Sequence, residues 1–286
     1  MRSFDAQLEH LVKEALLEDV GDGDHSTLSS IPKDQKGKAV LKIKQAGILA
    51  GVTVAEKIFR LVEPGVVFHP FKKDGEAMQP GENAFEVTAS VHTILTCERL
   101  VLNCMQRMSG IATLTHRYTA KLEGYHTRLL DTRKTTPNFR LLEKEAVKIG
   151  GGVNHRFGLY DMIMLKDNHI DYAGGLEQAI NAAYSYSQQL QQPLKIEVET
   201  RSLEDVRKVI GVGKGKVFRI MLDNFSPVQV SEAVQLIDGA FETEASGGIN
   251  LETIQAYAAT GVDFVSVGGL IHQAQSLDLS LKAVLV

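Results

Sequence analysis

The sequence contains little cysteine and none of the short motifs that mark common metal sites. Cys97 and Cys104 are the only two cysteines among 286 residues, and neither a CxxC nor an HExxH pattern occurs. A structural metal site is therefore not expected. On one helix the two thiols would lie roughly 10 Å apart along the axis, which is too far for a disulfide. Both are expected to be buried apolar groups in a protein of the reducing cytoplasm.

Other absences argue against a nucleotide cofactor, a membrane span and nucleic-acid binding. No Walker A sequence occurs, and no GxGxxG opens a helix after a strand. No run approaches the ~20 apolar residues of a membrane span, and residues 1–20 form an acid-containing amphipathic pattern that is not typical of a signal peptide. The net charge is −4, which does not suit a surface that coats nucleic acid or anionic membrane. The sequence therefore predicts a cytoplasmic protein whose partners are small molecules.

The first hundred residues are expected to form a mixed α+β unit. Hydrophobic patterning predicts a helix over 4–19 and strands over 39–49, near 66–72 and over 84–91. A helix is expected over 94–108, with a break at Ser109-Gly110 before a second helix that ends near 122.

After residue 111 short apolar strands alternate with helices, which is typical of a parallel sheet. Six strands are fewer than the eight of a closed barrel, so the expected fold class is α/β with an open, incomplete barrel over 111–270. Residues 1–110 are expected to form the other domain, with 271–286 returning to it because 277–284 alternates like an edge strand. The predicted strands are 128–132, 161–165, 194–200, 217–222, 240–245 and 263–267, and the predicted helices are 137–149, 175–190, 202–210, 227–237 and 250–259.

Five basic side chains near the ends of the first strands predict a pocket for a small ligand with several negative charges. They lack the three- or four-residue spacing of a solvated helix face, and clustered cations favour a multiply anionic ligand. They are Arg133, Lys134, His155, Arg156 and Lys166.

Acids and glycines follow the later strands, and carboxyl ends of barrel strands meet at one edge. Glu199 and Asp223 could hold ribose hydroxyls, Mg²⁺ or a developing positive charge on a sugar carbon. Glycines before a helix let a phosphate approach the backbone N–H groups. The residues expected to do so are Ser246, Gly247, Gly248, Gly268 and Gly269. A rival hypothesis is a barrel aldolase that forms a Schiff base at Lys166, although this leaves the arginines without a role.

Seven stretches in order along the chain carry a family resemblance: ERLVLNCMQRMSGIATLT (98–115), DTRKTTP (131–137), EKEAVKIGGGVNHRFGLYDMIMLKDNHI (143–170), EVET (197–200), IMLDNFSP (220–227), EASGGIN (244–250) and VDFVSVGGL (262–270). They resemble the quinolinate phosphoribosyltransferases, also called carboxylating nicotinate-nucleotide pyrophosphorylases. The resemblance implies an N-terminal α/β sandwich packed on an open α/β barrel. It also implies a homodimer in which Arg99 serves the pocket of the neighbouring subunit.

The resemblance further implies a role for each candidate residue. Arg133, Lys134, His155, Arg156 and Lys166 match the family's basic positions for quinolinate and pyrophosphate. Glu199 and Asp223 match its acids for phosphoribosyl pyrophosphate and Mg²⁺, and with Lys166 they are the expected catalytic residues. The Ser246–Gly248 and Gly268–Gly269 segments match its 5′-phosphate site. The segment GVGKGKVFR (211–219) departs from the family's pattern, on a connection expected to lie away from the site.

The implied reaction is a glycosyl (pentosyl) transfer of the de novo NAD pathway, coupled to decarboxylation. The quinolinate nitrogen attacks the sugar carbon as pyrophosphate leaves, and the positive ring nitrogen then stabilises the carbanion left by CO₂. Neither pyridoxal phosphate nor a nucleotide cofactor is required. Two alternatives are a nicotinate or other monocarboxylate phosphoribosyltransferase on the same fold, which would leave some cations unpaired, and a non-catalytic anion-binding protein, which would not require both acids.

Overall fold

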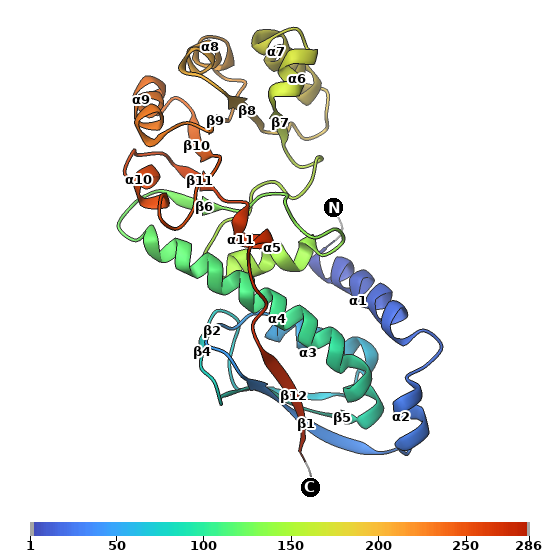
Figure 1. Ribbon diagram of the computed structural model, residues 1–286. Coiled ribbons are helices and arrows are strands. Elements are labelled where there is room, and N and C mark those ends of the chain that lie inside the picture. The colour runs from blue at the N-terminus through green and yellow to red at the C-terminus, as the bar shows by residue number, and fades with distance from the viewer. Residues whose placement is uncertain (1–2, 285–286) are drawn as a thin grey trace. The chain divides into compact units, whose positions relative to one another are not determined.

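The computed structural model describes residues 3–284, which divide into two compact units (Figure 1). Unit 1 comprises residues 3–116, 135–151 and 270–284, and unit 2 comprises 117–134 and 152–269. Residues 1–2 and 285–286, at the ends of the predicted domain ranges, lie outside the described residues. Residues 135–151, expected to belong to the barrel, thus have most of their contacts in unit 1. The predicted domain boundary at residue 110 stays a prediction.

Unit 1 is built on a four-stranded antiparallel sheet with the order β12-β1-β5-β3. Its strands are β1 (Lys36–Ile43), β3 (Val67–Pro70), β5 (Asn83–Ser90) and β12 (Leu279–Val284), and β2 (Gly47–Ile48) pairs separately with β4 (Ala77–Met78). In β12 Leu279 and Leu281 are buried while Ser280 and Lys282 are not. This alternation lets β12 cover the edge of β1 with one apolar face.

The helices of unit 1 begin at sequence signals that stabilise a first turn. The Ser3 side chain accepts a hydrogen bond from the Ala6 N–H before α1, and Asp24 accepts one from the Thr27 N–H before α2. The helices are α1 (Phe4–Val20), α2 (His25–Ser30), α3 (Val52–Val62), α4 (Val91–Lys121), α5 (Arg140–Ile149) and the short α11 (Gly269–His272). Both α4 and α11 extend across a boundary between the units.

The predicted break at Ser109-Gly110 is wrong, because both residues lie inside α4, a continuous helix of 31 residues. Both residues serve packing in place of a turn. The Ser109 hydroxyl accepts a hydrogen bond from the Ala50 N–H at 3.0 Å. At Gly110 a Cβ atom would lie 2.0 Å from the Gln275 carbonyl oxygen. A helix tolerates one glycine at a cost of about 1 kcal/mol, and here the glycine permits close approach of another backbone segment.

Unit 2 contains a six-stranded parallel sheet with the order β6-β11-β10-β9-β8-β7, which confirms the expected open barrel. No pairing joins β6 to β7 in the described part of the chain, so the sheet does not close. The first and last residues of each of these strands lie within two residues of their predicted positions. The strands are β6 (Arg128–Leu130), β7 (Ile163–Leu165), β8 (Ile196–Thr200), β9 (Arg219–Asp223), β10 (Glu242–Ser246) and β11 (Phe264–Ser266).

Helices connect these strands and pack along the sheet, as Figure 1 shows for unit 2. They are α6 (Asp167–Tyr172), α7 (Leu176–Gln188), α8 (Leu203–Gly213), α9 (Pro227–Ile237) and α10 (Ile254–Ala258). Helix α6 was not predicted, because six residues are too few to establish a helical period. Ser202 and Ser226 cap α8 and α9, and Pro227 occupies the first turn of α9. Within residues 3–284 no helix combines the length and the apolar character needed to cross a membrane.

Two glycine-to-alanine substitutions should have opposite effects on stability. Gly110→Ala places a methyl group against backbone, so we expect the free energy of unfolding to fall by about 1–3 kcal/mol. Gly211→Ala, within α8 and with open space around its Cβ position, should raise it by about 0.5–1 kcal/mol through helix propensity. Urea unfolding of both variants measures the difference, and a Gly110→Ala variant as stable as the wild type would contradict the packing argument.

Candidate active site

Charged residues occupy alternate positions of three neighbouring strands in unit 2. Glu197 of β8 lies opposite Arg219 of β9, and Arg219 lies opposite Glu242 of β10. Residues two apart in a strand point to the same face. The next level toward the carboxyl ends therefore brings Glu199 and Glu244 to the same face, and the level after that brings Asp223 opposite Ser246. The parallel register stacks the candidate acids on one face of the sheet.

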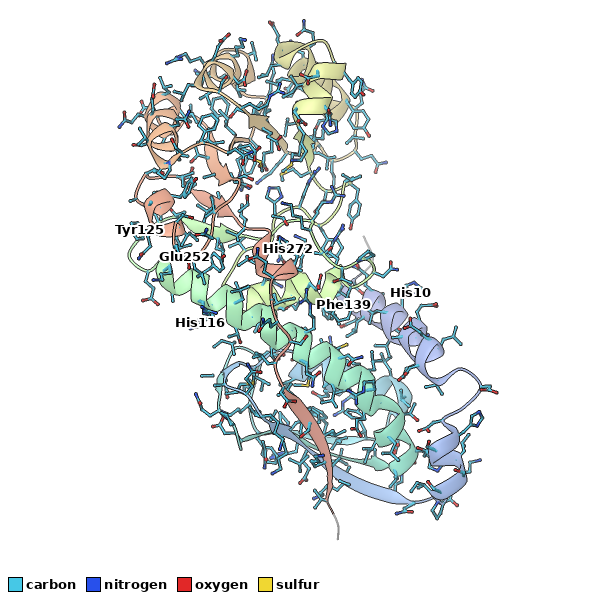
Figure 2. The ribbon with its side chains drawn as sticks, in the orientation of Figure 1. His10, His116, Tyr125, Phe139, Glu252 and His272 are labelled. Carbon is cyan, nitrogen blue, oxygen red and sulfur yellow. The ribbon has the colours of Figure 1, made fainter. Side chains whose placement is uncertain are left out.

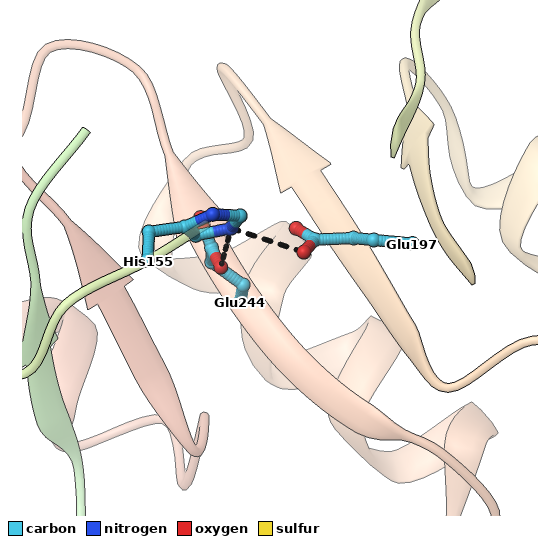
Figure 3. Close-up of side chains that lie close together, drawn as sticks. All are labelled: His155, Glu197 and Glu244. Carbon is cyan, nitrogen blue, oxygen red and sulfur yellow. Dashed lines mark ion pairs between the residues drawn. The ribbon is translucent and has the colours of Figure 1, made fainter. Parts of the chain in front are cut away.

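The His155 side chain enters this face and lies between two buried carboxylates (Figure 3). Its Nε2 atom is 3.0 Å from an oxygen of Glu197 and 3.2 Å from one of Glu244. The imidazole is 5% exposed and both carboxylates are fully buried. His155 was expected at the mouth of the pocket as an anion-binding cation, whereas this nitrogen faces the protein's own acids.

Arg219 completes the group and is bound on both sides. Its guanidinium lies 2.9 Å from Glu244 and 3.8 Å from Glu197, and it donates to Glu242 at 2.8 and 3.2 Å. The guanidinium carbon also lies 4.2 Å from the centre of the Phe264 ring, a distance typical of a cation–π contact. His155, Glu197, Arg219 and Glu244 are called here the buried charge cluster.

The charges of this cluster shift the pKa values of its members. Burial by itself would lower the pKa of His155, but Glu197 and Glu244 raise it to about 9. Burial and the charge of Glu244 raise the pKa of Glu197 to about 7. Burial also disfavours the charged form of Glu244, but His155, Arg219 and Ser266 outweigh it and lower that pKa. His155 contributes most to keeping Glu244 charged, and the nearby Arg219 and the Ser266 hydroxyl add to its effect.

Hydrogen bonds to the backbone fix the loop that carries His155. The buried carboxylate of Asp131, just after β6, accepts from the His155 backbone N–H at 2.8 Å and from the side-chain NH₂ of Asn154 at 2.7 Å. The Arg156 N–H lies 2.7 Å from Nδ1 of His155, a contact that favours the neutral ring. Two carboxylates at about 3 Å outweigh one amide dipole in a buried site, so the imidazolium is the favoured form at neutral pH.

Two arginines on neighbouring segments form the cationic part of the site. The Nε atom of Arg133 is buried and has no hydrogen-bond partner among the residues described. Burial and the charge of Arg133 lower the pKa of Arg156, which places the two cations within electrostatic reach. Arg156 donates one bond, at 3.3 Å, to the Met162 carbonyl. Lys134 is exposed beside them. Unpaired buried donors and mutually repelling cations together favour an anionic ligand.

Lys166 and Glu199 form an ion pair at the carboxyl ends of β7 and β8. Glu199 is buried and the lysine side chain is 44% exposed, so the pair reaches solvent. The Lys166 nitrogen is engaged by Glu199, whereas a Schiff-base lysine must present its nitrogen to a carbonyl carbon. The pairing therefore argues against the aldolase hypothesis.

Asp223 and Glu199 offer the hard oxygen donors that Mg²⁺ prefers, on adjacent strands of one face. Mg²⁺ is commonly held by one or two carboxylates together with substrate phosphates, so these donors fit that ion. The buried charge cluster contains three potential ligands, His155, Glu197 and Glu244. It does not fit a divalent cation, because the Arg219 guanidinium already lies between the acids.

The glycine segments adopt two different conformations. Gly247 and Gly248 have φ angles of 97° and 62°, and a Cβ at Gly247 would lie 2.2 Å from the Asn224 side chain. The Asn224 side chain thus fills the space beside Gly247, whereas open space surrounds the Cβ position of Gly248 and leaves its backbone open to close approach. Gly268 and Gly269 have no left-handed φ. The helices that follow have five and four residues, so helix dipoles contribute little there.

Some sequence candidates lie elsewhere, and some members of the site were missed. Arg99 is exposed on α4 in unit 1. Other histidines lie on elements away from this sheet face, such as His10 on α1, His116 on α4 and His272 on α11 (Figure 2). Sequence reasoning missed the roles of Glu197, Arg219 and Glu244. Charged residues at alternate positions of short apolar strands were the available signal.

The raised pKa of His155 predicts that stability falls at alkaline pH. The pKa of His155 is about 9 in the folded protein and 6.5 without its partners. Its contribution to the free energy of unfolding is therefore complete below pH 6.5 and is lost as the pH rises through about 9. We expect urea unfolding to show a loss on the order of 1–3 kcal/mol over this window. The loss should be smaller in His155→Gln. A wild-type profile that is flat between pH 6.5 and 9 would contradict the imidazolium assignment.

Family models match almost the entire chain. The model for quinolinate phosphoribosyl transferase, N-terminal domain, matches residues 24–109, and the model for its C-terminal domain matches residues 111–282. The two matches include every candidate residue of the site.

Individual proteins extend this similarity over the full length. The chain is 43% identical to a chloroplastic nicotinate-nucleotide pyrophosphorylase [carboxylating] of Arabidopsis thaliana, over 96% of this chain and 82% of that protein. It is 42% identical to a probable nicotinate-nucleotide pyrophosphorylase [carboxylating] of Bacillus subtilis, over 98% of this chain and 94% of that protein. The crystal structure of NadC from Streptococcus pyogenes matches with a TM-score of 0.90 and 42% identity, over 99% of this chain and 98% of that one. The chain belongs to the quinolinate phosphoribosyltransferase family.

Proposed function

We propose that this protein transfers the phosphoribosyl group of phosphoribosyl pyrophosphate to quinolinate and releases pyrophosphate and CO₂. The product is nicotinate mononucleotide, in the de novo NAD pathway. The observation that carries the proposal is the position of two arginines, one with an unpaired buried Nε, beside a sheet face that carries Glu199 and Asp223. This arrangement provides cations for a dicarboxylate and acids for a sugar centre in one unit.

Quinolinate carries two adjacent carboxylates, and the basic residues suit them. Arg133 and Arg156 can each form charge-assisted hydrogen bonds worth roughly 1.5–3 kcal/mol to a carboxylate. Lys134 adds an exposed positive charge, and His155 adds a buried one close to Arg156. A ligand with one carboxylate would leave part of this charge without a partner.

Phosphoribosyl pyrophosphate brings a 5′-phosphate, ribose hydroxyls and a pyrophosphate. The left-handed turn at Gly247-Gly248 lets the 5′-phosphate approach the backbone N–H groups after Ser246, and the Gly268-Gly269 segment offers a second set. Glu199 and Asp223 would hold the ribose and a Mg²⁺ ion. When bound, this ion neutralises charge on the pyrophosphate. Lys166 is free to turn from Glu199 toward the leaving group because its side chain reaches solvent.

The chain's residues then act on the two bond changes. As the bond between the ring nitrogen and the sugar carbon forms, the bond from that carbon to pyrophosphate breaks, and positive charge develops on the sugar. Glu199 and Asp223 stabilise this charge. The ring nitrogen becomes positive, so the electron pair left when CO₂ departs is stabilised on the adjacent ring carbon. The arginines hold the other carboxylate and keep the ring in place. The ring itself accepts the electron pair, and the proposal calls on neither pyridoxal phosphate nor a nucleotide cofactor.

The proposal includes a cytoplasmic homodimer. Arg99 lies exposed on α4, in the unit that does not carry the sheet-face acids. An exposed arginine within a family motif, on the polar side of a helix, suits a contact with the pocket of a second subunit.

The first test is a comparison of two substrates with purified protein. With Mg²⁺ and phosphoribosyl pyrophosphate, we expect turnover of quinolinate with one CO₂ released per mononucleotide formed, and little turnover of nicotinate. Chromatography of the mononucleotide and trapping of CO₂ measure both products. Preference for nicotinate would overturn the account of the cations, and inactivity with both substrates would favour a binding protein.

A substitution tests the cationic part directly. Arg133→Ala should raise the KM for quinolinate by about 10- to 100-fold, the equivalent of one charge-assisted contact, with the KM for phosphoribosyl pyrophosphate within about twofold. Arg207→Ala is the matched control, because Arg207 is an exposed arginine on α8 that lies 3.9 Å from Glu232. Equal effects of Arg133→Ala on the two substrates would count against its assignment to quinolinate.

A further inference from the structure

The buried charge cluster occupies the level of Glu197 and Arg219 and, through Glu244, the level of Glu199. The reaction described above does not use the acids of this cluster. Taking the proposed function as the basis, we propose that Glu244, together with Glu197 and Arg219, is a positioning residue for the substrate-binding cations. These three residues hold the His155 imidazole, and through it the adjoining Arg156, in the orientation that meets the pyridine carboxylates.

The need for such a device follows from where His155 lies. Its loop, residues 154–157, has no regular secondary structure, so neither helix nor sheet geometry sets the direction of its side chain. Two restraints replace them: the bond from its N–H to Asp131 and the two carboxylates at Nε2. Rotation of the imidazole would break its contacts with both carboxylates, and the ring lies directly against the Arg156 N–H. The ring therefore links the sheet face to the backbone of Arg156.

The charges around His155 come from every strand that faces it. Glu197 is on β8, Arg219 on β9, Glu244 on β10, and Asp131 follows β6, while Arg156 is the next residue in the loop. Glu197, Glu242 and Glu244 all lie near the single guanidinium of Arg219, so the negative charge of these acids exceeds what it offsets. A cationic His155 faces this excess, so the imidazole is held in place by charge as well as by contact.

The acids differ in which partner they touch, and this allows a matched comparison. Glu244 lies 3.2 Å from His155 and 2.9 Å from Arg219. Glu242 is bonded to the same arginine at 2.8 Å and is 38% exposed, but no contact with His155 is found among the described residues. Removing the charge of Glu244 should affect His155 directly. Removing that of Glu242 leaves Arg219 paired with Glu244 and should disturb His155 much less.

The experiment is a double-mutant cycle on the full-length protein with steady-state kinetics. Glu244→Gln preserves side-chain volume and should raise the KM for quinolinate about 10-fold or more, with the KM for phosphoribosyl pyrophosphate within about twofold. Glu242→Gln should leave both KM values within about twofold of those of the wild type. The Glu244→Gln/His155→Gln double variant should show a KM for quinolinate no higher than His155→Gln alone, because residues that act through one another are not additive.

Additive effects in the cycle would overturn the proposal, as would equal loss for both substrates or an equal effect of Glu242→Gln. A thermal unfolding curve for each variant separates loss of positioning from loss of folded protein. If Glu244→Gln does not fold, Glu197→Gln takes its place, because it removes the charge of the other carboxylate at Nε2. The same changes in the two KM values are expected for it. Calorimetric binding of quinolinate repeats the cycle without turnover, so failure of the proposed reaction stays distinct from failure of the positioning role.

Discussion

The common parallel register of β8, β9 and β10 is the constraint on which the site depends. It sets Arg219 between Glu197 and Glu242 and brings Glu244 to the next level of the same face. Buried carboxylates are costly unless they are paired, and here one guanidinium serves two strands. A slip of one residue would turn these side chains to the opposite face, where unpaired charges would meet apolar helices. The charge pairs therefore strongly favour the register that also aligns the candidate site.

The face divides into a buried part and an open part. Toward the amino ends of the strands Glu197 and Arg219 are buried and form ion pairs within the protein. Toward the carboxyl ends the side chains are partly exposed, as at Lys166 and Asp223, or lack a partner atom, as at Arg133. This division matches the general rule that barrels carry stability at one end and chemistry at the other. It also shows how a chain of net charge −4 maintains a local positive site for a multiply charged anion.

His155 links the two parts. It adjoins Arg156 of the open part, and its Nε2 atom contacts the acids of the buried part. A histidine on an irregular loop would otherwise sample several rotamers, and each would present a different surface to a substrate. Anchoring by two carboxylates removes that freedom before a ligand arrives, which lowers the cost of ordering the site upon binding.

Much of this could be predicted from the sequence, because it depends on local patterns. The alternation of short apolar strands with helices located all six strands of the parallel sheet to within two residues, and the motifs from Arg133 to Lys166 identified the family and its cations. Three features were decided only by the tertiary structure. Helix α4 continues through Ser109-Gly110 because those residues pack against distant backbone. His155 faces inward, and Arg219 joins two acids, because strands distant in sequence share one register. A sequence encodes which residues alternate along each strand, but which of them meet depends on the pairing of strands in three dimensions.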